Sequence, residues 1–295
     1  MVREKLLNFL LIYQNRDKEV CTEMMKDDKV TNRQLIPKVI HYCWFGNSIK
    51  PRLFRKCFQS WKKYCPDYEI IEWNEKNFNI DCCKYVREAY DAQKYAYVTD
   101  FARLWIIYNY GGVYLDTDVE LIRSLDDLLY NSAYFGLEDS KHINTGLGFG
   151  AEKGNNIVKK MMEEYYNASF FNEDGSYNMM TCPVRNTASI ATYLPSIMGK
   201  DVIHIKDAVI YPPEFFCPLE PSCVNLNKTN NTYSIHWFSA SWLSDEEVII
   251  HDWRVFLGKC EKYLGKKVGR LFARIVYLFR PKKRNILKNA DARKE

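Results

Sequence analysis

The order of apolar and polar positions along the chain predicts alternating strands and helices from residue 36 onward. Residues 36–46 (IPKVIHYCWFG) and 68–74 (YEIIEWN) are runs of β-branched and aromatic side chains, which are typical of buried strands. Between them, residues 51–64 carry apolar side chains at the spacing of one helical face: Leu53, Cys57, Phe58 and Trp61. A strand, a helix and a strand in this order are the unit from which parallel sheets are built.

A second helix-to-strand unit follows. Residues 84–94 predict a helix, and Thr99 occupies the position expected of the N-cap of a further helix, DFARLWIIYNY. Gly111 and Gly112 end that helix, because glycine is common just beyond a helix C-terminus. The apolar run VYLD then predicts a strand, and the short strand VELI follows two residues later.

The second half of the chain continues as a mixture of both elements. Strands are expected in YFGLE, INTGLGFGA, VIHI, AVIYP and TYSIHWF, and helices at residues 124–130, 155–167 and 184–197. From Ser244 to Pro281 the pattern is helical. We therefore expect a mixed α/β domain with helical additions at both ends: an N-terminal helical extension at 1–33, the domain at 34–250 and a basic amphipathic helical tail at 251–295.

Charge distinguishes that tail from the domain. From residue 254 to the end there are 14 Lys/Arg and 3 Asp/Glu, a net charge of +11, whereas the whole chain is +5, which leaves −6 for residues 1–253. Apolar and basic side chains alternate through residues 264–284, a composition typical of helices at anionic membrane surfaces. A helix packed on the domain is the alternative, as is a nucleic-acid contact. Since no RNA- or DNA-binding motif occurs elsewhere, we expect peripheral membrane contact and no nucleic acid.

The cysteines and the N-terminus bear on the compartment. The 10 Cys include the adjacent pair Cys82 and Cys83 but no CxxC spacing, which argues against a zinc ribbon or a redox motif. The N-terminal apolar run, residues 6–13, is interrupted by Asn8, is too short to span a bilayer and precedes no small-residue cleavage site. We expect reduced, buried cysteines in a cytoplasmic chain at the inner face of the membrane.

The strongest chemical signal is GGVYLDTDVE. Residues i and i+2 of an extended segment point the same way, so Asp116 and Asp118 would face one point beyond the strand end, where α/β sheets bind ligands. Two convergent carboxylates need a cation, and Mn²⁺ or Mg²⁺ would bridge them to substrate phosphates. A solvated acidic turn is the structural alternative. Aspartyl phosphatases also use D-x-D-x-T/V, but Glu120 stands where they have Thr or Val.

Other polar residues have two interpretations each. Asp100 and Arg103 share a helix face and could bind sugar hydroxyls, although spacing alone favours a simple ion pair. Asn144, in the Gly-rich INTGLGFG, could bring backbone close to a sugar or lie in an irregular strand. Among the histidines, His236 is a candidate metal ligand. His41 is expected to be a structural residue in the core, and His204 is also expected to be structural.

Several blocks together resemble one glycosyltransferase family. The blocks are IPKVIHYCWFG, SWKKYCPDYEIIEWNEKNF, VTDFARLWIIYNYGGVYLDTDVE and SIHWFSASW, spanning about residues 36–242. The family includes the yeast initiating α-1,6-mannosyltransferase and bacterial capsular-polysaccharide sugar transferases, and more distantly the clostridial glucosylating toxins. The resemblance implies a GT-A fold, a nucleotide-sugar donor such as UDP-hexose or GDP-mannose, Mn²⁺ or Mg²⁺, and retention of anomeric configuration. It also implies a glycan or lipid-linked oligosaccharide acceptor in surface polysaccharide synthesis.

The resemblance also implies roles in donor binding. Trp44 would lie against the nucleobase, although a tryptophan at the end of a buried strand is more often a core residue. Asp100 and Arg103 would contact the donor sugar, and Tyr114 would line the donor pocket.

A second set of residues is implied to hold the metal and the diphosphate. Asp116 would reach the ribose and the metal, and Asp118 would bind the metal. His236 or Ser239 would complete the metal shell, at a position where the toxins have an acidic residue. Trp242 would cap the departing diphosphate. Two other functions stay open, a D-x-D phosphohydrolase and a non-catalytic membrane-associated scaffold.

Overall fold

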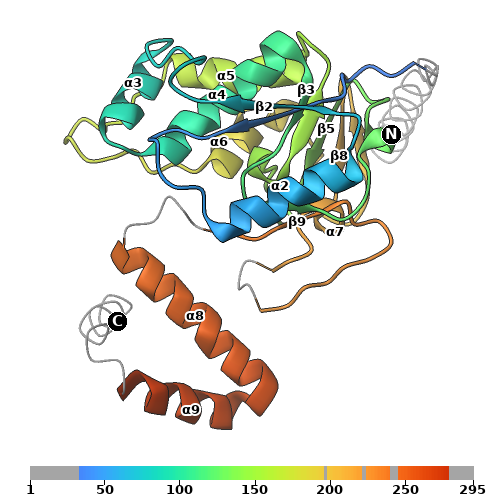
Figure 1. Cartoon of the computed structure of the whole chain (residues 1–295). Coiled ribbons are helices and arrows are strands. Elements are labelled where there is room, and N and C mark those ends of the chain that lie inside the picture. Colours follow the sequence, from blue (N-terminus) through green and yellow to red (C-terminus); the bar gives the residue numbers. More distant parts are fainter. Residues whose placement is uncertain (1–32, 196–197, 221–223, 240–244, 279–295) are drawn as a thin grey trace, which may run out of the picture. The chain divides into compact units, whose positions relative to one another are not determined.

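The computed structural model describes residues 33–195, 198–220, 224–239 and 245–278 (Figure 1). Its described residues from Leu35 onward belong to one compact unit. The expected N-terminal helical extension, residues 1–33, lies almost entirely outside the described residues, as do Trp242 and the last part of the basic tail.

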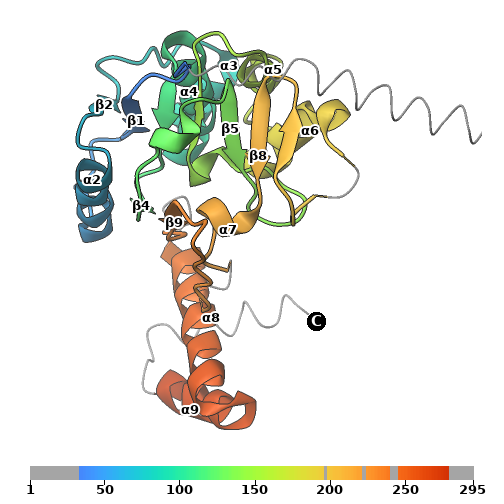
Figure 2. The same cartoon turned by 90° about the vertical axis from the view of Figure 1, so that its right-hand side faces the viewer.

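A seven-stranded mixed sheet runs through the domain in the order β2-β1-β3-β6-β5-β8-β7 (Figures 1 and 2). Its strands are β1 (Val39–Cys43), β2 (Glu69–Trp73), β3 (Gly112–Tyr114), β5 (Ala133–Gly136), β6 (Phe149–Ala151), β7 (Ile203–Ile205) and β8 (Ala208–Tyr211). β1 is parallel to β2 and β3, and β5 is parallel to β8. β6 is antiparallel to both β3 and β5, so β3 and β5 run in the same direction. The expected mixed α/β fold is therefore confirmed.

Helices α2 (Arg52–Tyr64), α3 (Lys84–Asp91) and α5 (Asn156–Tyr166) begin and end close to the boundaries that periodicity predicts. The other helices are α4 (Tyr95–Tyr110), α6 (Cys182–Ser189), α7 (Pro213–Phe216), α8 (Asp245–Leu264) and α9 (Lys266–Leu278). Three short 3₁₀ helices join them: η1 (Asp126–Leu128), η2 (Thr145–Leu147) and η3 (Ala191–Tyr193). β4 (Val119–Leu121) and β9 (Ser234–His236) form a separate two-stranded sheet.

The sheet separates two hydrophobic clusters because strand side chains alternate between its faces. On β3, Tyr114 joins the cluster under α3, α4 and α5, whereas Val113 and Leu115 join the cluster under α2 and η1. On β5, Phe135 packs on the first side and Tyr134 on the second. Both faces of the sheet are thus covered, which explains why the strands read as continuous apolar runs rather than as alternating ones.

Some local expectations were wrong. Thr99 does not cap α4, which begins four residues earlier at Tyr95. The Thr99 hydroxyl instead donates to the Tyr95 carbonyl at 3.0 Å, a bond that a threonine within a helix makes readily. The expected helix at 184–197 is the shorter α6 followed by η3. His204 is exposed on β7, and Cys82 and Cys83 are only partly buried, because both sites lie at the edges of the fold.

His41 is a satisfied core residue, as the sequence indicates. The indole N–H of Trp73 donates to His41 Nδ1 at 3.1 Å, so the ring proton sits on Nε2 and bonds to the Gly111 carbonyl at 3.0 Å. Burial lowers the pKa of His41 to about 4 and keeps it neutral. This histidine therefore holds the turn between α4 and β3.

The C-terminal helices form a hairpin. Gly265, at φ +77°, separates α8 from α9, and Gly269 lies where an added Cβ would meet the Cys260 carbonyl oxygen at 2.4 Å. Arg270 Nε donates to Glu261 Oε1 at 2.6 Å across the pair. Among the described residues, no helix combines the length and the apolar character needed to cross a bilayer.

We expect Gly112→Ala to destabilise the domain far more than a glycine replacement in open space. Gly112 has φ +104°, and a Cβ there would lie 2.8 Å from the Val39 carbonyl oxygen and 3.0 Å from His41 Nε2. The left-handed backbone costs roughly 1–2 kcal/mol, and the steric overlap adds about 1–3 kcal/mol. Urea unfolding would measure the loss.

The matched control is Gly175→Ala, at φ +81° with no atom within 4 Å of the added Cβ. It should lose only the backbone cost. Equal losses at the two positions would contradict the packing assigned to the α4–β3 turn.

Candidate active site and metal centre

The two carboxylates of the D-x-D segment converge through a turn rather than through strand alternation. β3 ends at Tyr114, and residues 117 and 118 form a turn closed by the Val119 N–H, which donates to the Asp116 carbonyl at 3.0 Å. Asp116 and Asp118 still face one site, as expected, but the extended conformation assumed for them is wrong. β4 begins at Val119, directly after this turn.

Pairing of β4 with β9 brings His236 to this turn. Val119 is opposite His236 in the antiparallel ladder, and the Trp237 N–H donates to the Asp118 carbonyl at 3.1 Å. His236 Nε2 consequently lies 3.2 Å from Asp118 Oδ1, and the Ser239 N–H donates to Asp118 Oδ2 at 2.8 Å. The late SIHWFS block and the D-x-D segment therefore form one site.

α4 supplies a buried Asp–Arg pair. Arg103 Nη2 lies 3.1 Å from Asp100 Oδ1 and 3.3 Å from Asp116 Oδ1. The chain geometry accounts for this approach. Eight helical residues from Arg103 to the Gly111 turn cover about 12 Å, and four extended residues from Gly112 to Asp116 return about 13 Å. The pair is thus more than the local helix contact that its spacing favours.

The Gly-rich segment closes the site on a third side. Because β6 is antiparallel to β3, the residues before β6 lie at the edge where β3 ends. The Asn144 side chain accepts from the Gly146 N–H at 2.6 Å and opens η2, so this segment is a capped 3₁₀ turn. A Cβ on Gly146 would meet Asp116 Oδ2 at 2.6 Å, Asn144 Oδ1 at 2.9 Å and Arg103 Nη1 at 3.0 Å. Only glycine allows the backbone this close to the carboxylate.

Burial sets the protonation of the site. It raises the pKa of Asp100 to about 6 against the attraction of Arg103. It also raises the pKa of Asp116, which Arg103 opposes and the neighbouring Asp118 reinforces. Burial acts in the same sense on Asp118, yet His236 and the Ser239 N–H hold the pKa of Asp118 well below its usual value. Three carboxylates thus share one guanidinium and one imidazole in a site from which water is largely excluded.

These side chains fit a divalent cation. One candidate group occurs within the described residues: Asp116, Asp118 and His236 each offer a ligand atom, and these atoms lie within 4.8 Å of one another. His236 Nδ1 is buried and has no hydrogen-bond partner among the described residues. A cation with ligand distances near 2.0–2.3 Å could be reached by all three. Two carboxylates and an imidazole suit Mn²⁺ or a related transition metal, and Mg²⁺ less well.

The remaining predicted site residues lie at different distances from this centre. The Tyr114 hydroxyl donates to Asp116 Oδ1 at 2.9 Å, and its ring lies under Arg103, so it belongs to the cluster. Ser239 is exposed and contacts Asp118 through its backbone N–H, and its side chain also bonds to this carboxylate and helps to lower the pKa of Asp118. Trp44 lies at the end of β1, partly buried, and its indole N–H donates to the Ser48 carbonyl at 2.9 Å.

Three further residues border the site without having been anticipated. Cys182, the first residue of α6, lies 3.8 Å from Arg103 Nη1 and 3.6 Å from Asn144 Oδ1. Glu138 accepts from Asn144 Nδ2 at 2.5 Å. Burial lowers the pKa of His236, but Asp118, then Asp116 and to a smaller extent Glu138 raise it above its usual value. Arg185 is nine-tenths buried between the rings of Tyr85 and Tyr165, and it favours the ionised form of Asp100. The position of Glu138 could have been found from the sequence, because it follows strand β5 as Asp116 follows β3. No sequence pattern around α6 marks Cys182 or Arg185 as residues of the site.

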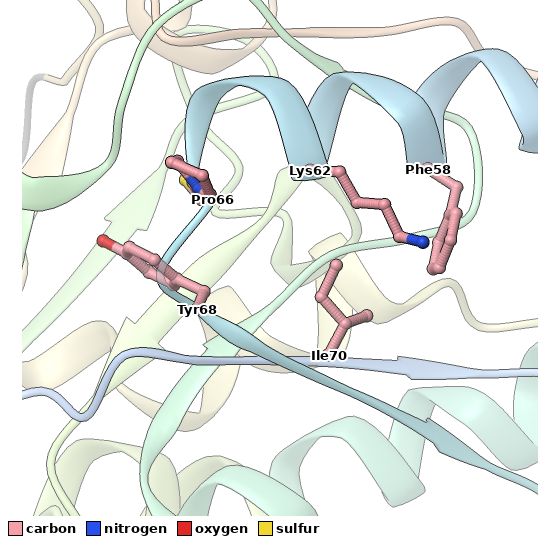
Figure 3. Close-up of a pocket in the computed structure, with 6 residues that line it drawn as sticks. Phe58, Lys62, Pro66, Tyr68 and Ile70 are labelled. Atoms are coloured by element: carbon pink, nitrogen blue, oxygen red, sulfur yellow. The ribbon is translucent and has the colours of Figure 1, made fainter.

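A separate pocket of about 440 Å³ opens between α2 and β2 (Figure 3). Phe58 and Lys62 of α2 and Ile70 of β2 line it, with Tyr68 and Pro66 at its other end. It contains no carboxylate, and none of its residues belongs to the acidic cluster. We assign it no part in the chemistry.

Comparison with known proteins agrees with this geometry. Residues 51–135 match the family described as "Glycosyltransferase sugar-binding region containing DXD motif". This segment is therefore similar to the sugar-binding region of the DXD glycosyltransferases. The matched segment of this DXD family holds Asp100, Arg103, Tyr114, Asp116 and Asp118, whereas His236 lies beyond it.

Curated relatives match a little over a third of the chain. Inositol phosphoceramide mannosyltransferase 3 of Schizosaccharomyces pombe is 34% identical over 124 residues, covering 38% of this chain and 35% of the relative. Mannosyl phosphorylinositol ceramide synthase SUR1 of Saccharomyces cerevisiae is 30% identical over 119 residues, covering 39% of this chain and 31% of the relative. The chain therefore spans about a third of the length of these relatives.

Solved structures resemble the chain more remotely. The PaToxG glycosyltransferase has a TM-score of 0.42 at 15% identity, covering 54% of this chain and 70% of its own. A glycosyltransferase involved in glycosylation of the major capsid of PBCV-1 has a TM-score of 0.40 at 16% identity, covering 69% and 95%.

We expect Gly146→Ala to weaken Mn²⁺ binding by about tenfold or more, equivalent to about 1.4 kcal/mol. The added methyl group would displace the Asp116 carboxylate from Arg103 and from the metal site that it faces together with Asp118. Isothermal titration with Mn²⁺ would measure the change.

Gly150→Ala is the control, because its Cβ would meet the ring of Tyr134 at 2.5 Å and no carboxylate. It should lower stability and leave Mn²⁺ affinity intact. Unchanged Mn²⁺ affinity in Gly146→Ala would remove Asp116 from the metal centre.

Proposed function

We propose that this protein is a metal-dependent, retaining glycosyltransferase that moves a hexose from a nucleotide-sugar donor to a glycan or lipid acceptor. The observation that carries the proposal is the buried Asp116–Asp118–His236 group, set inside and beside the DXD sugar-binding region. The GT-A type of α/β fold agrees with the mixed sheet and with the carboxylates at its edge.

The residues around the centre would have separate roles in binding the cation and the donor. Asp116, Asp118 and His236 would hold the cation, which supplies neutralisation of the donor diphosphate. Ser239 orients Asp118 through its N–H, and Tyr114 orients Asp116 through its hydroxyl. Asp100 and Arg103 are fixed beside Asp116 and would accept from and donate to donor-sugar hydroxyls. Asn144 and Trp44 would complete the donor pocket, with Trp44 against the base.

The transfer itself needs no covalent intermediate on the protein. The bond between the anomeric carbon and the phosphate oxygen breaks, and the acceptor oxygen bonds to that carbon on the same face. The acceptor proton leaves with the nucleoside diphosphate. Each carboxylate near the centre is engaged by Arg103, Tyr114 or His236, which supports this front-face route over a nucleophilic aspartate.

The relatives narrow the donor and acceptor within this proposal. The names of these relatives specify transfer of mannose and an inositol phosphoceramide acceptor. Mannose from GDP-mannose and a lipid acceptor are therefore our first choices, with UDP-hexose and surface-polysaccharide glycans as the second. We also propose that residues 34–250 form the glycosyltransferase domain.

Phosphohydrolase chemistry is less well supported. That mechanism needs the first aspartate free to attack phosphorus, but Asp116 accepts from Tyr114 and lies against Arg103. Release of inorganic phosphate from simple phosphomonoesters would favour it. A scaffold function would predict no nucleotide-sugar binding at all.

We expect Mn²⁺ with one class of nucleotide sugar to raise the thermal unfolding midpoint of the wild-type chain. Ligand at a hundred times its Kd stabilises by about 2.7 kcal/mol. Asp118→Asn should abolish this shift and slow transfer by at least about a hundredfold, because it removes the charge that binds the cation. A panel of UDP-, GDP- and CMP-sugars would identify the base.

Asp201→Asn, a change at an exposed acid outside the cluster, should behave as wild type. Normal turnover in Asp118→Asn would overturn the metal-centred function.

The basic tail supports peripheral attachment to an anionic membrane. α9 exposes Leu271 and Ile275 by 61% and 46%, on a helix that also carries Lys266, Lys267, Arg270 and Arg274. Exposed apolar residues flanked by basic ones are typical of interfacial helices. Each basic residue near an anionic surface adds roughly 1 kcal/mol.

We expect Leu271→Glu combined with Ile275→Glu to abolish flotation of the chain with anionic liposomes. Ile49→Glu, at a residue 95% exposed outside the tail, is the control and should float as wild type. Flotation of the double variant at the wild-type level would exclude α9 as the membrane contact.

A further inference from the structure

A second pocket opens directly beside the metal centre. It has a volume of about 420 Å³, within the range of about 300–1,000 Å³ typical of small-molecule sites. Residues 237–239 form one wall, and the other wall is one face of α8, contributed by Val248, His251, Val255 and Lys259 with their neighbours. Spacing of three and four residues along α8 places these side chains in a single row.

The pocket and the metal centre share residues. Ser239 lines the pocket, and its N–H bonds to Asp118 Oδ2 at 2.8 Å. Phe238 also lines the pocket, and its ring packs edge-on against His236 at 4.4 Å between centroids. Phe238 has φ +48°, a backbone conformation unusual for an aromatic residue and found where a site constrains the chain. Anything bound here would lie next to the reacting centre.

The lining fits a molecule that is polar at one end and apolar at the other. Trp237, Phe238 and Phe256 offer flat apolar faces, and the Trp237 ring is fixed by its N–H bond to Glu120 Oε2 at 2.8 Å. Lys259 adds a cationic group on the α8 wall, and His251 Nδ1 lies 3.7 Å from Oδ1 of Asp252, which also lines the pocket. Aromatic faces suit the C–H surface of a ring polyol, and a cationic group suits a phosphate.

The connection of α8 to α9 indicates how such a molecule would arrive. α8 lines the pocket and is followed after Gly265 by α9, whose exposed Leu271 and Ile275 lie among basic residues. One hairpin therefore carries both the pocket wall and the surface suited to an anionic membrane. A lipid held by the membrane could present its headgroup to the pocket while its chains stay in the bilayer.

We infer that the pocket between residues 237–239 and α8 is the acceptor subsite, and that it takes a hydroxylated, phosphate-bearing headgroup of a lipid. This inference rests on the proposed transferase function and adds to it the residues that would select the acceptor. Aromatic rings of residues 237 and 238 orient the polyol ring, and Lys259 pairs with the phosphate. The acceptor hydroxyl then faces the donor carbon held beside Asp118.

The test separates acceptor recognition from donor recognition. Glycerophosphoinositol serves as the soluble headgroup probe and methyl α-D-mannoside as a probe without phosphate, each titrated calorimetrically in the presence of Mn²⁺ and nucleoside diphosphate. Val255→Trp should fill the pocket, and Lys259→Glu should repel the phosphate. Both should weaken glycerophosphoinositol binding at least about tenfold, and both should keep the donor-induced rise in the unfolding midpoint.

Arg254→Glu makes the same charge change as Lys259→Glu at an exposed position on α8 that does not line the pocket, and it should bind as wild type. Wild-type affinity in both pocket variants would overturn the subsite, as would failure of the wild-type chain to bind glycerophosphoinositol. Equal binding of the two probes would overturn the role of Lys259. Loss of the donor-induced shift in the pocket variants would assign the pocket to the donor. Absence of that shift in wild type would instead overturn the proposed function.

Discussion

The site depends on one buried guanidinium. Arg103 lies between Asp100 and Asp116, both within 3.3 Å, in a region where an unpaired carboxylate would be strongly disfavoured. Its own position is fixed from below by the Tyr114 ring and from the helix by the Thr99 carbonyl. One positive charge nevertheless leaves the cluster negative, and this excess of negative charge would favour the binding of a divalent cation.

The sheet explains how separate parts of the chain meet at this charge. β1, β3 and β5 run in one direction, so the residues after each strand lie along one edge. β6 runs the other way, and the segment before it reaches the same edge. Trp44, Asp116, Glu138 and Asn144 are therefore neighbours of one edge although they are spread over a hundred residues of sequence. The two faces are occupied by packed helices, which leaves the edge as the place where polar groups can converge.

The small β4–β9 sheet connects that edge to the C-terminal hairpin. β4 begins directly after Asp118, and β9 ends at His236, so one ladder fixes the third candidate ligand and starts the wall formed by residues 237–239. A transferase must hold a donor and an acceptor on the two sides of one reacting bond. In the function proposed above, the main sheet and α4 would support the donor, and the β9 segment with α8 would support the acceptor.

The sequence by itself determined most of the elements and the convergence of Asp116 and Asp118. Periodicity located α2, β1 and β2 to within a few residues, and the apolar run before Asp116 marked a strand end. The contact of Arg103 with Asp116 was not predicted, because the spacing of Asp100 and Arg103 favoured a simple ion pair, although the chain lengths on either side of Gly111 and Gly112 are compatible with it. Thr99 was misplaced because a hydroxyl can cap a helix or bond within one, and local sequence does not distinguish the two.

Only the tertiary structure decided which distant residues complete the site. His236 meets Asp118 through strand pairing across more than a hundred residues, and Cys182 and Arg185 reach Asp100 through the packing of α6. The turn at residues 117–118, rather than strand alternation, aims the two aspartates. Local periodicity indicates which face of an element is buried, but it does not indicate which element packs against that face. The packing of the whole domain sets that partner, and the candidate metal centre and the pocket beside α8 depend on this packing.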